Sequence, residues 1–246
     1  MNDATSPARE AHAALHLDVD AGLIRDARLT LDDARALFDA AGVEVAQRGR
    51  GAIRIIESAF GRAVVRHYRR GGLMARLSHD WFIWTGTETT RPLREFRITR
   101  QLQASGLPVP EAIAARYVRV GLGYRADLVT LLVPQARTLA ERLQDKAANV
   151  DWVALGDMLA RFHAHGLWHA DLNAHNILVA GEGRLLLIDF DRARWVAPFG
   201  ACLRGNLDRL ARSLRKLGHS SCVDGAAWRQ LLDAYARATQ TAHAGR

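Results

Sequence analysis

The sequence has almost no lysine and almost no cysteine. Of its 246 residues, 34 are lysine or arginine, yet lysine occurs only at Lys146 and Lys216. A site in the first 145 residues that needs a cation must therefore use arginine. The two cysteines, Cys202 and Cys222, are too few for the disulfide framework of a small secreted protein, so a reducing compartment fits.

Long apolar runs are also missing. No stretch approaches the roughly 18 apolar residues of a membrane-spanning helix. The longest runs, such as residues 128–134 and 185–188, have the length of β-strands. The polar, alanine-rich residues 1–14 lack the apolar segment of a secretory signal. We therefore expect the chain to act in the cytoplasm.

The formal net charge of +8 indicates an anionic partner, such as nucleic acid, anionic lipid or a phosphorylated substrate. Arg91, Arg94, Arg97 and Arg100 recur every three residues and would form one stripe on a helix. That stripe is either an ordinary solvated face or a surface for lipid head groups, worth on the order of 1 kcal/mol per basic residue. No zinc finger, RNA-recognition or recognition-helix pattern is present, so nucleic acid is not the expected partner.

The order of predicted elements indicates an α+β fold. Runs of β-branched and aromatic residues predict strands over 52–59, 62–68, 112–120 and 126–133. Apolar residues at helical spacing predict helices over 91–105, 151–165, 206–217 and 226–238. Most strands precede most helices, which fits a small antiparallel-sheet lobe followed by a mainly helical lobe. We assign the three parts to an N-terminal tail (1–28), a first lobe (29–133) and a second lobe (134–246).

The segment that carries chemistry is residues 169–178, His-Ala-Asp-Leu-Asn-Ala-His-Asn-Ile-Leu. Asp171 and Asn176 lie five positions apart, and Asp189 follows thirteen positions later, beyond a predicted hairpin. This spacing resembles the protein-kinase catalytic loop, His-x-Asp-x-x-x-x-Asn, followed by the metal-binding Asp-Phe-Gly. A lone Asp-Phe-Asp would be explained as polar turn capping, but the complete set at kinase spacing favours a phosphoryl-transfer site.

Each residue type suits one part of that reaction. Phosphoryl transfer needs a positioned hydroxyl and neutralised phosphate oxygens. Asp171 is the candidate catalytic residue that orients the acceptor hydroxyl and receives its proton, and His169 would position the loop. Asn176 and Asp189 offer the oxygen ligands that Mg²⁺ prefers, and His175 is a candidate substrate contact. The sequence thus predicts ATP and Mg²⁺ at one site.

A kinase also needs a glycine-rich phosphate loop, a cation on the third strand and a helix glutamate that holds the cation. Gly49 and Gly51 are the candidates for the loop, and Glu95 is the candidate glutamate. Because no lysine is available, Arg66 is the candidate cation; arginine stays charged and can bridge phosphate and carboxylate. Arg62 is the alternative, although a solvated turn residue is its simpler interpretation.

Several blocks in order make the resemblance more specific: 48–51, 66–72, 106–110, 169–178, 188–191 and 212–216. Over about residues 45–235 the chain resembles the 3-deoxy-D-manno-octulosonic acid (Kdo) kinases, which are related to the lipopolysaccharide core heptose kinases. The resemblance implies a protein-kinase-like two-lobed fold and an arginine at the strand-cation position. It implies transfer of the ATP γ-phosphate to the 4-hydroxyl of Kdo on a lipid A precursor. This would occur at the anionic cytoplasmic face of the inner membrane, with no obligate protein partner.

The chain departs from protein kinases at Asp191, which replaces the motif glycine, and it lacks an Ala-Pro-Glu motif. Residues 192–205 are too few for a peptide-binding activation segment, so a small or lipid-linked acceptor is expected. Two alternatives stay open: a kinase of another hydroxyl, such as a core heptose or a small molecule, and a catalytically silent kinase-fold binding module. Mg²⁺-dependent ATP binding would separate the silent module from both kinases. The histidines around the motif are spaced too widely for paired zinc ligands, and His163 is better explained as a core residue.

Overall fold

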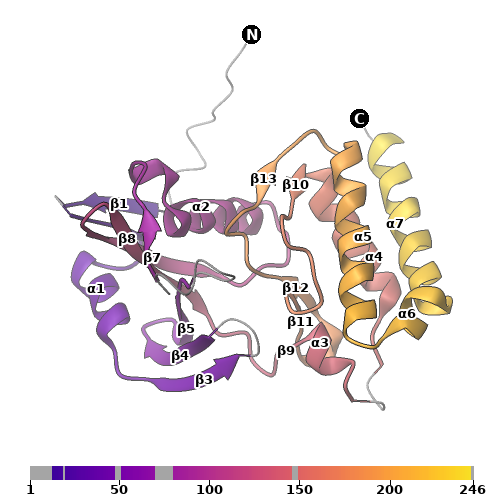
Figure 1. Cartoon of the computed structure of the whole chain (residues 1–246), viewed down its shortest axis with the longest axis horizontal. Helices are drawn as coiled ribbons and strands as arrows, with labels where there is room; N and C mark the ends of the chain where they lie inside the picture. Colours follow the sequence, from indigo (N-terminus) through magenta and orange to yellow (C-terminus); the bar gives the residue numbers. More distant parts are fainter. Residues whose placement is uncertain (1–12, 19, 48–50, 70–79, 146–148, 245–246) are drawn as a thin grey trace, which may run out of the picture. The chain divides into compact units, whose positions relative to one another are not determined.

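The computed structural model describes residues 13–18, 20–47, 51–69, 80–145 and 149–244. The chain divides into two compact units (Figure 1). Unit 1 comprises Met1–Ser105 and Pro110–Leu132, and unit 2 comprises Gly106–Val109 and Val133–Arg246. The short stretch Gly106–Val109 belongs with unit 2 because its carbonyl groups accept hydrogen bonds from that unit. The backbone N–H of Leu187 donates to Pro108 O at 3.0 Å, and Arg161 Nη2 donates to Gly106 O at 2.6 Å.

Unit 1 is an antiparallel sheet with helices on its faces (Figure 1). Its strands are β1 (Ala13–Leu17), β2 (Ala21–Asp26), β3 (Val43–Gln47), β4 (Gly51–Ser58), β5 (Gly61–His67), β6 (Phe82–Ile83), β7 (Ala112–Val120) and β8 (Gly123–Leu131). Its helices are α1 (Leu31–Asp39), the 3₁₀ turn η3 (Thr87–Thr89) and α2 (Arg91–Ala104). Within the described residues, the strand order is β1-β2-β7-β8-β5-β4-β3, and β6 pairs with β8.

The two faces of this sheet bury separate apolar clusters. Strand residues alternate between them, so that Leu23 of β2 joins one cluster and the next residue, Ile24, joins the other. Leu37 and Phe38 of α1 cover the first face, whereas Phe96 of α2 belongs to the cluster on the second face. The helix α1 begins at its N-cap Thr30, whose side chain accepts a hydrogen bond from Asp33 N. The sheet therefore carries α2 on the face opposite α1.

The prediction of a tail over residues 1–28 is wrong for the part that the structure describes. Residues 13–17 and 21–26 form β1 and β2, and β2 pairs with β7 in the register Ala21↔Val118 to Arg25↔Ala114. Alanine and glycine make both segments look weakly structured in the sequence. They are strands because β7 offers β2 a full set of backbone partners and because Leu23 and Ile24 each bury against a cluster.

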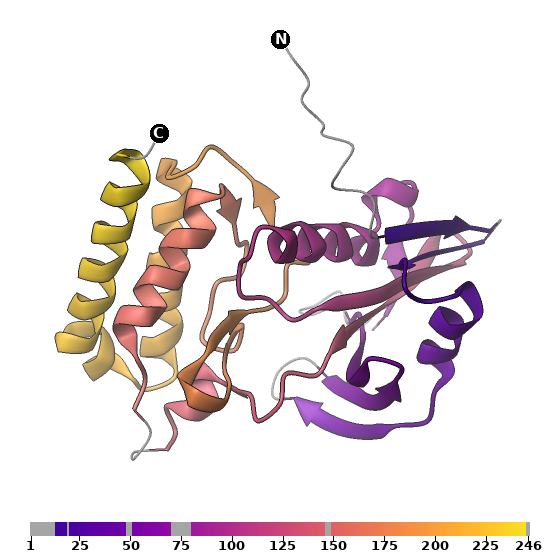
Figure 2. The same ribbon diagram turned by 180° about the vertical axis from the view of Figure 1, so that it is seen from behind.

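Unit 2 is mainly helical. Its helices are α3 (Leu139–Arg142), α4 (Trp152–Ala164), the 3₁₀ turn η4 (Gly181–Gly183), α5 (Ala201–Lys216), α6 (Ser220–Asp224) and α7 (Ala226–Ala244). Its short strands are β9 (Arg137–Thr138), β10 (Leu167–Trp168), β11 (Ile177–Val179), β12 (Leu185–Leu187) and β13 (Arg194–Trp195). Helices α4 and α7 pack side by side (Figure 2). Gly156 allows this approach, because a Cβ there would lie 2.3 Å from Leu231 O.

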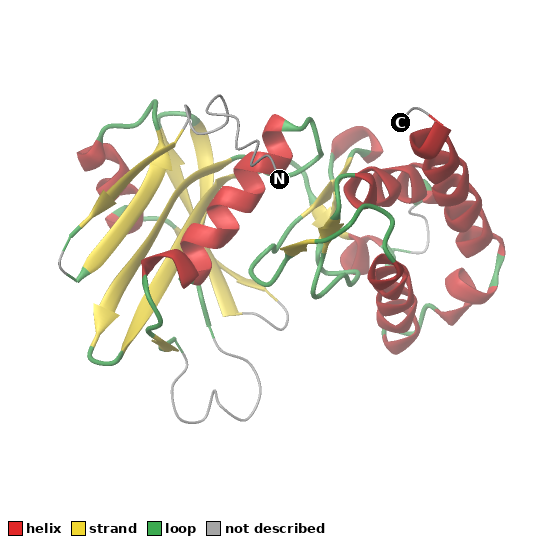
Figure 3. Cartoon of the chain, turned by 90° about the horizontal axis from the view of Figure 1, so that it is seen from above, coloured by secondary structure: helices red, strands yellow, loops and turns green. Residues whose placement is uncertain are grey.

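The predicted α+β class is confirmed, with the long strands in unit 1 and most of the helices in unit 2 (Figure 3). Most predicted elements occur within two or three residues of their expected bounds. The strand β7, for example, covers residues 112–120 as predicted. Helix α5 begins five residues before its predicted start at residue 206, and helix α7 continues six residues beyond its predicted end at residue 238.

Candidate functional site

Unit 1 contains a partly buried ion pair between the predicted strand cation and the predicted helix glutamate. Arg66 on β5 pairs with Glu95 on α2, and Tyr68 donates its hydroxyl hydrogen to the same carboxylate oxygen of Glu95. The guanidinium of Arg66 also lies over the ring of Tyr68, 4.6 Å from its centre. Because the Glu95 side chain is only 3% exposed, its charge depends on these partners. The alternative cation, Arg62, is exposed and lies beside Glu57 at 3.8 Å.

The predicted phosphate loop falls between β3 and β4. Gly49 lies outside the described residues. Gly51 is the first residue of β4 and pairs with Gln47, the last residue of β3. Both glycines thus come before β5 in the chain, the strand that carries Arg66. This is the order of glycine-rich loop and strand cation found in protein kinases.

In unit 2 the predicted catalytic loop connects β10 to β11. His169, which is buried, donates its Nε2–H to Ile188 O at 3.0 Å and accepts a hydrogen bond from Asp171 N at its Nδ1, at 3.2 Å. These two partners require the neutral Nε2–H tautomer. Its ring also meets the ring of Phe190 edge-on, with ring centres 5.5 Å apart. Both ring nitrogens of His169 therefore have backbone partners, one within the loop and one at Ile188.

Helix α5 fixes the same loop from the other side. The side chain of Asn206, 1% exposed, accepts a hydrogen bond from His169 N at 3.1 Å and donates one to His169 O at 2.6 Å. Further along α5, Ser213 Oγ accepts a hydrogen bond from Ala174 N at 3.2 Å. Asn206 is not among the residues predicted from the sequence. The available clue in the sequence was that Asn206 is a polar residue on a helix face that Leu203, Leu207 and Leu210 otherwise make apolar.

Asp171 combines a fixed backbone with an exposed side chain. Its N–H donates to His169, and its carbonyl oxygen accepts from Asn173 Nδ2 at 3.1 Å and from Asn176 Nδ2 at 2.7 Å. Three side chains thereby hold the peptide groups on both sides of its Cα. The residue itself is exposed, so its carboxylate can reach a bound molecule. His175 is half-buried in the same loop, and its N–H donates to Asn173 Oδ1 at 2.8 Å.

The β11–β12 hairpin brings the two predicted metal ligands to one end. Asn176 directly precedes Ile177, which pairs with Leu187, and Asp189 lies two residues after Leu187. The N–H of Ile188 donates to Asn176 O at 2.9 Å, which closes this end of the hairpin. Asp189 has φ of 71°, a left-handed conformation that non-glycine residues adopt only at some cost. The strain marks a side-chain direction that the surrounding structure imposes.

These two residues fit a magnesium ion. Asn176 is fully buried, and its Oδ1 has no hydrogen-bond donor within the described chain, although its Nδ2 is engaged. An unsatisfied buried amide oxygen is costly, so a ligand for that oxygen is expected. Among the described residues no cluster of three or more histidine, cysteine, aspartate or glutamate side chains is arranged to hold a metal. Mg²⁺ needs no such cluster, because it takes one or two protein oxygens and completes its shell with phosphates and water.

Two other predictions can be compared with the structure. His163 is a buried core residue of α4, as expected, and its Nδ1 lies 2.8 Å from the hydroxyl of Tyr235 on α7. The basic stripe on α2 is not a uniform solvated face. Arg100, 18% exposed, pairs with buried Asp26, whereas Arg94 is exposed.

Comparison with known proteins agrees with this geometry. Residues 40–235 match the model of the lipopolysaccharide kinase (Kdo/WaaP) family. A 3-deoxy-D-manno-octulosonic acid kinase of Stenotrophomonas maltophilia (strain K279a) is 43% identical over 223 residues, which cover 91% of this chain and 89% of the relative. Kinases of the same name from Xylella fastidiosa (strain M12) and Xanthomonas axonopodis pv. citri (strain 306) are 44% and 42% identical. These two matches cover 73% and 87% of this chain, and 72% and 86% of the relatives.

The family match extends from β3 into α7 and includes the candidate strand cation, the candidate helix glutamate, the predicted catalytic loop and the hairpin that follows it. The predicted protein-kinase-like fold is therefore confirmed. This chain belongs to the lipopolysaccharide kinase (Kdo/WaaP) family.

Proposed function

We propose that this chain transfers the γ-phosphate of ATP to the 4-hydroxyl of Kdo in a Kdo-lipid A precursor during synthesis of the lipopolysaccharide core. The relatives described above bear the name of that kinase. The observation that carries the proposal is the loop geometry: an exposed carboxylate, Asp171, on a backbone that three side chains hold in place. A binding module without catalysis has no need of that arrangement.

Asp171 is the proposed catalytic residue. Its carboxylate accepts a hydrogen bond from the acceptor hydroxyl and so directs an oxygen lone pair at the γ-phosphorus. A bond forms between the acceptor oxygen and phosphorus, and the bond between phosphorus and the β–γ bridging oxygen breaks. ADP leaves with that oxygen, and the hydroxyl proton passes to Asp171. Because the Asp171 backbone is fixed, little ordering remains for the moment of reaction.

Asn176 Oδ1 and the Asp189 carboxylate are the proposed ligands of Mg²⁺. The ion, when bound, neutralises charge on the phosphate oxygens of ATP. The hydrogen bond from Asn176 Nδ2 to Asp171 O fixes the amide so that Oδ1 is the atom available for a cation. The same bond couples the ligand residue to the backbone of the catalytic residue.

Arg66 is the proposed phosphate-binding cation of unit 1. Its guanidinium has donors on more than one edge, so it can pair with Glu95 and with a phosphate at once. Glu95 and the Tyr68 ring limit where the guanidinium can lie. Arginine in place of the usual kinase lysine is thus compatible with nucleotide binding.

The test is phosphate transfer from labelled ATP to a Kdo-lipid A precursor. Asp171→Ala should lower kcat by about a thousand-fold or more while ATP affinity stays within about two-fold. Asp157→Ala, at an exposed position on α4, is the matched control and should behave as wild type.

Three outcomes discriminate among the candidate functions. Transfer by the wild type that Asp171→Ala abolishes supports the proposal. A wild type that binds ATP and Mg²⁺ but transfers only to a heptose acceptor refutes the Kdo assignment. Failure of the wild type to bind ATP with Mg²⁺ favours a silent binding module.

We also propose that the enzyme works on the anionic inner-membrane surface, where its lipid-linked acceptor lies. Among the described residues no helix combines the length and apolar character of a membrane span. Support comes instead from exposed apolar side chains at one end of the sheet: Ile83 on β6 is 60% exposed and Leu122, in the β7–β8 turn, is 83% exposed. Val120, beside them in the sheet register, is also exposed, and the chain carries a net charge of +8.

Co-sedimentation with phosphatidylglycerol-containing vesicles tests this surface. Replacing Ile83 and Leu122 together by Asp should reduce the bound fraction several-fold. Val43→Asp, at a comparably exposed valine on β3, is the control and should bind as wild type does. Equal binding by all three proteins would refute this location for the membrane contact.

A further inference from the structure

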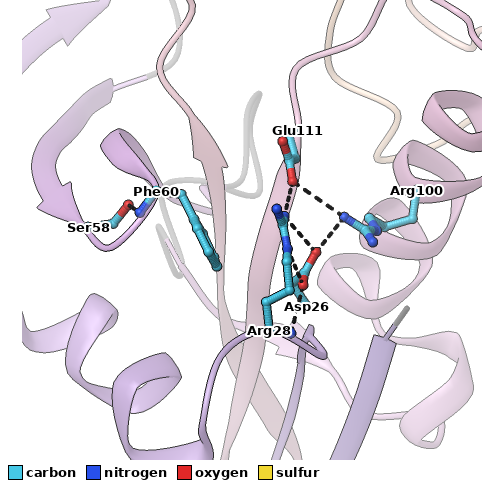
Figure 4. A network of polar contacts seen from close by, with 6 residues as sticks. All are labelled: Asp26, Arg28, Ser58, Phe60, Arg100 and Glu111. Atoms are coloured by element: carbon cyan, nitrogen blue, oxygen red, sulfur yellow. Dashed lines mark hydrogen bonds and ion pairs between the residues drawn. The ribbon is translucent and has the colours of Figure 1, made fainter. Parts of the chain in front are cut away.

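A network of two carboxylates and two arginines surrounds the buried Asp26 at the end of β2 (Figure 4). Asp26, 2% exposed, accepts hydrogen bonds from Arg28 Nε at 2.8 Å and Arg28 Nη2 at 3.0 Å. Arg100 Nη1 reaches the same carboxylate at 2.7 Å. Glu111, just before β7, pairs with Arg28 and lies 3.7 Å from Arg100. The charges of the four side chains balance.

Asp26 is charged in this network. Burial alone would raise its pKa, but the hydrogen bonds from Arg28 and the charge of Arg100 together hold its pKa below the ordinary value. A buried ion pair is weak evidence for overall stability, but its charge-assisted hydrogen bonds restrict where the partner side chains can lie. The elements that Arg28 and Arg100 belong to or contact therefore indicate which parts of the fold the network holds in place.

The two arginines connect Asp26 to the two elements that carry the phosphate cation and its glutamate. Arg100 lies on α2, five residues after Glu95. Arg28 stacks its guanidinium over the ring of Phe60 at 4.3 Å, in the turn that begins β5. Arg66 lies near the other end of β5. One carboxylate thus contacts α2 directly and approaches β5 through Arg28.

Apolar packing alone does not fix the placement of α2 on the sheet. The cluster that includes Leu93 and Phe96 holds the helix against its face, but such contacts are not directional. The pair between Arg66 and Glu95 needs a particular axial position and rotation of the helix. The bond between Arg100 and Asp26 provides a directional contact near the C-terminal end of α2.

We propose that Asp26 is a positioning residue for nucleotide binding: through Arg100 and Arg28 it holds α2 and β5 so that Glu95 meets Arg66. This inference rests on the function proposed for Arg66, and it assigns a role to the strand β2, which precedes the family match. In this role Asp26 acts through Arg100 and Arg28 and not by contact with the nucleotide.

Calorimetric titration with ATP and Mg²⁺ tests the proposal without any acceptor. Asp26→Asn keeps the shape of the side chain and removes its charge, and it should weaken ATP binding by about ten-fold or more. Glu88→Gln is the matched control, because Glu88 pairs with Arg97 of the same helix at an exposed site and should leave ATP affinity unchanged. If Asp26→Asn loses its near-ultraviolet circular dichroism, Arg100→Lys replaces it, since lysine keeps the charge and loses the planar geometry.

A double-mutant cycle separates positioning from a general loss of stability. In a Glu95→Gln protein, whose Arg66 no longer has its charged partner, adding Asp26→Asn should weaken ATP binding by less than about two-fold. An equal effect of Asp26→Asn in both backgrounds would overturn the proposal, and so would unchanged ATP affinity of a folded Asp26→Asn protein. If the wild type binds no ATP, the proposed phosphate-binding role of Arg66 is refuted, and the positioning role of Asp26 is refuted with it. If it binds ATP but does not phosphorylate Kdo, only the acceptor assignment fails.

Discussion

The amide of Asn206 forms a two-point contact with the backbone of His169, accepting from its N–H at 3.1 Å and donating to its carbonyl at 2.6 Å. The contact joins α5 to the first residue of the catalytic loop, and both residues are buried. Since His169 Nδ1 in turn accepts a hydrogen bond from the N–H of Asp171, a chain of hydrogen bonds extends from the helix to the backbone of the proposed catalytic residue. The helix thus determines where the loop begins.

Replacing Asn206 by Leu should therefore damage catalysis more than ATP binding. Two buried backbone groups lose their partners, which should cost about 2–3 kcal/mol of unfolding free energy. The displaced loop should lower kcat by about ten- to a hundred-fold with little change in ATP affinity. Steady-state kinetics and urea unfolding measure both effects. Asp208→Leu, at an exposed position on the same helix, should change neither; a wild-type kcat for Asn206→Leu would refute the coupling.

Two substitutions of Asp189 distinguish the effect of backbone strain on stability from the effect of the side chain on metal binding. Its φ of 71° is tolerated better by Asn than by Ala, because the Asn side chain can bond locally in the left-handed region. Asp189→Asn should keep the unfolding free energy within about 0.5 kcal/mol of wild type and lose most Mg²⁺-dependent ATP binding. Asp189→Ala should lose both unfolding free energy and Mg²⁺-dependent ATP binding. Glu182→Ala, also at positive φ but in the turn at the opposite end of the β11–β12 hairpin from the proposed ligands, should lose stability alone. Mg²⁺-dependent binding retained by Asp189→Asn would contradict the ligand role.

Protonation of His163 should make the free energy of unfolding depend on pH. Burial lowers the pKa of His163 to about 4, although a hydrogen bond with Asn206 acts in the opposite direction. The unfolded chain has a histidine pKa of about 6.5, so between these values the unfolded state binds the extra proton. Stability is then complete above about pH 6.5 and falls as pH drops toward about 4, by on the order of 3 kcal/mol.

Urea unfolding of His163→Gln between about pH 4 and pH 7 checks this assignment. Glutamine does not titrate and can still bond the Tyr235 hydroxyl, so the slope of unfolding free energy with pH should flatten. His165→Gln, at an exposed position on the same helix end, should retain the wild-type slope. An unchanged slope in His163→Gln would assign the acid sensitivity to other groups.

Replacing Gly156 by alanine should disturb the packing of α4 against α7, whereas the same replacement at Gly205 should not disturb any packing. A methyl group at this position of α4 would lie 2.3 Å from Leu231 O, so Gly156→Ala should destabilise by about 1–3 kcal/mol despite the better helix propensity of alanine. At Gly205 on α5, by contrast, a Cβ would meet no atom within 4 Å. Gly205→Ala should therefore stabilise by about 0.5–1 kcal/mol. Thermal unfolding of both variants measures the difference, and a stable Gly156→Ala protein would mean that α7 can move away.

Features that depend on residues close together in the chain could be predicted from the sequence. The catalytic loop, the hairpin after it and the strand β7 were predictable because their residues are close in the chain and their spacing is distinctive. Asn206 was not predicted, because its partner His169 lies 37 positions away and a single buried amide leaves little local trace. The ion pair of Arg100 was missed for a related reason: its helical spacing indicated a surface stripe, either solvated or facing lipid head groups, and only the fold brings Asp26 against it. The proposed roles of Asp171, Asn176 and Asp189 stay predictions until the variants are measured.

The place of β2 in the sheet has a practical consequence for any shortened form of this protein. A chain that started at residue 29 would keep the region that matches the family, yet it would uncover β7 along its length. The N–H and C=O groups of β7 that pair with β2 would then face solvent as an open edge, next to apolar side chains such as Ile113 and Ala115. Open edges of that kind recruit strands from other molecules. Such a protein should therefore aggregate for reasons unrelated to its chemistry, and its inactivity would say nothing about the catalytic loop.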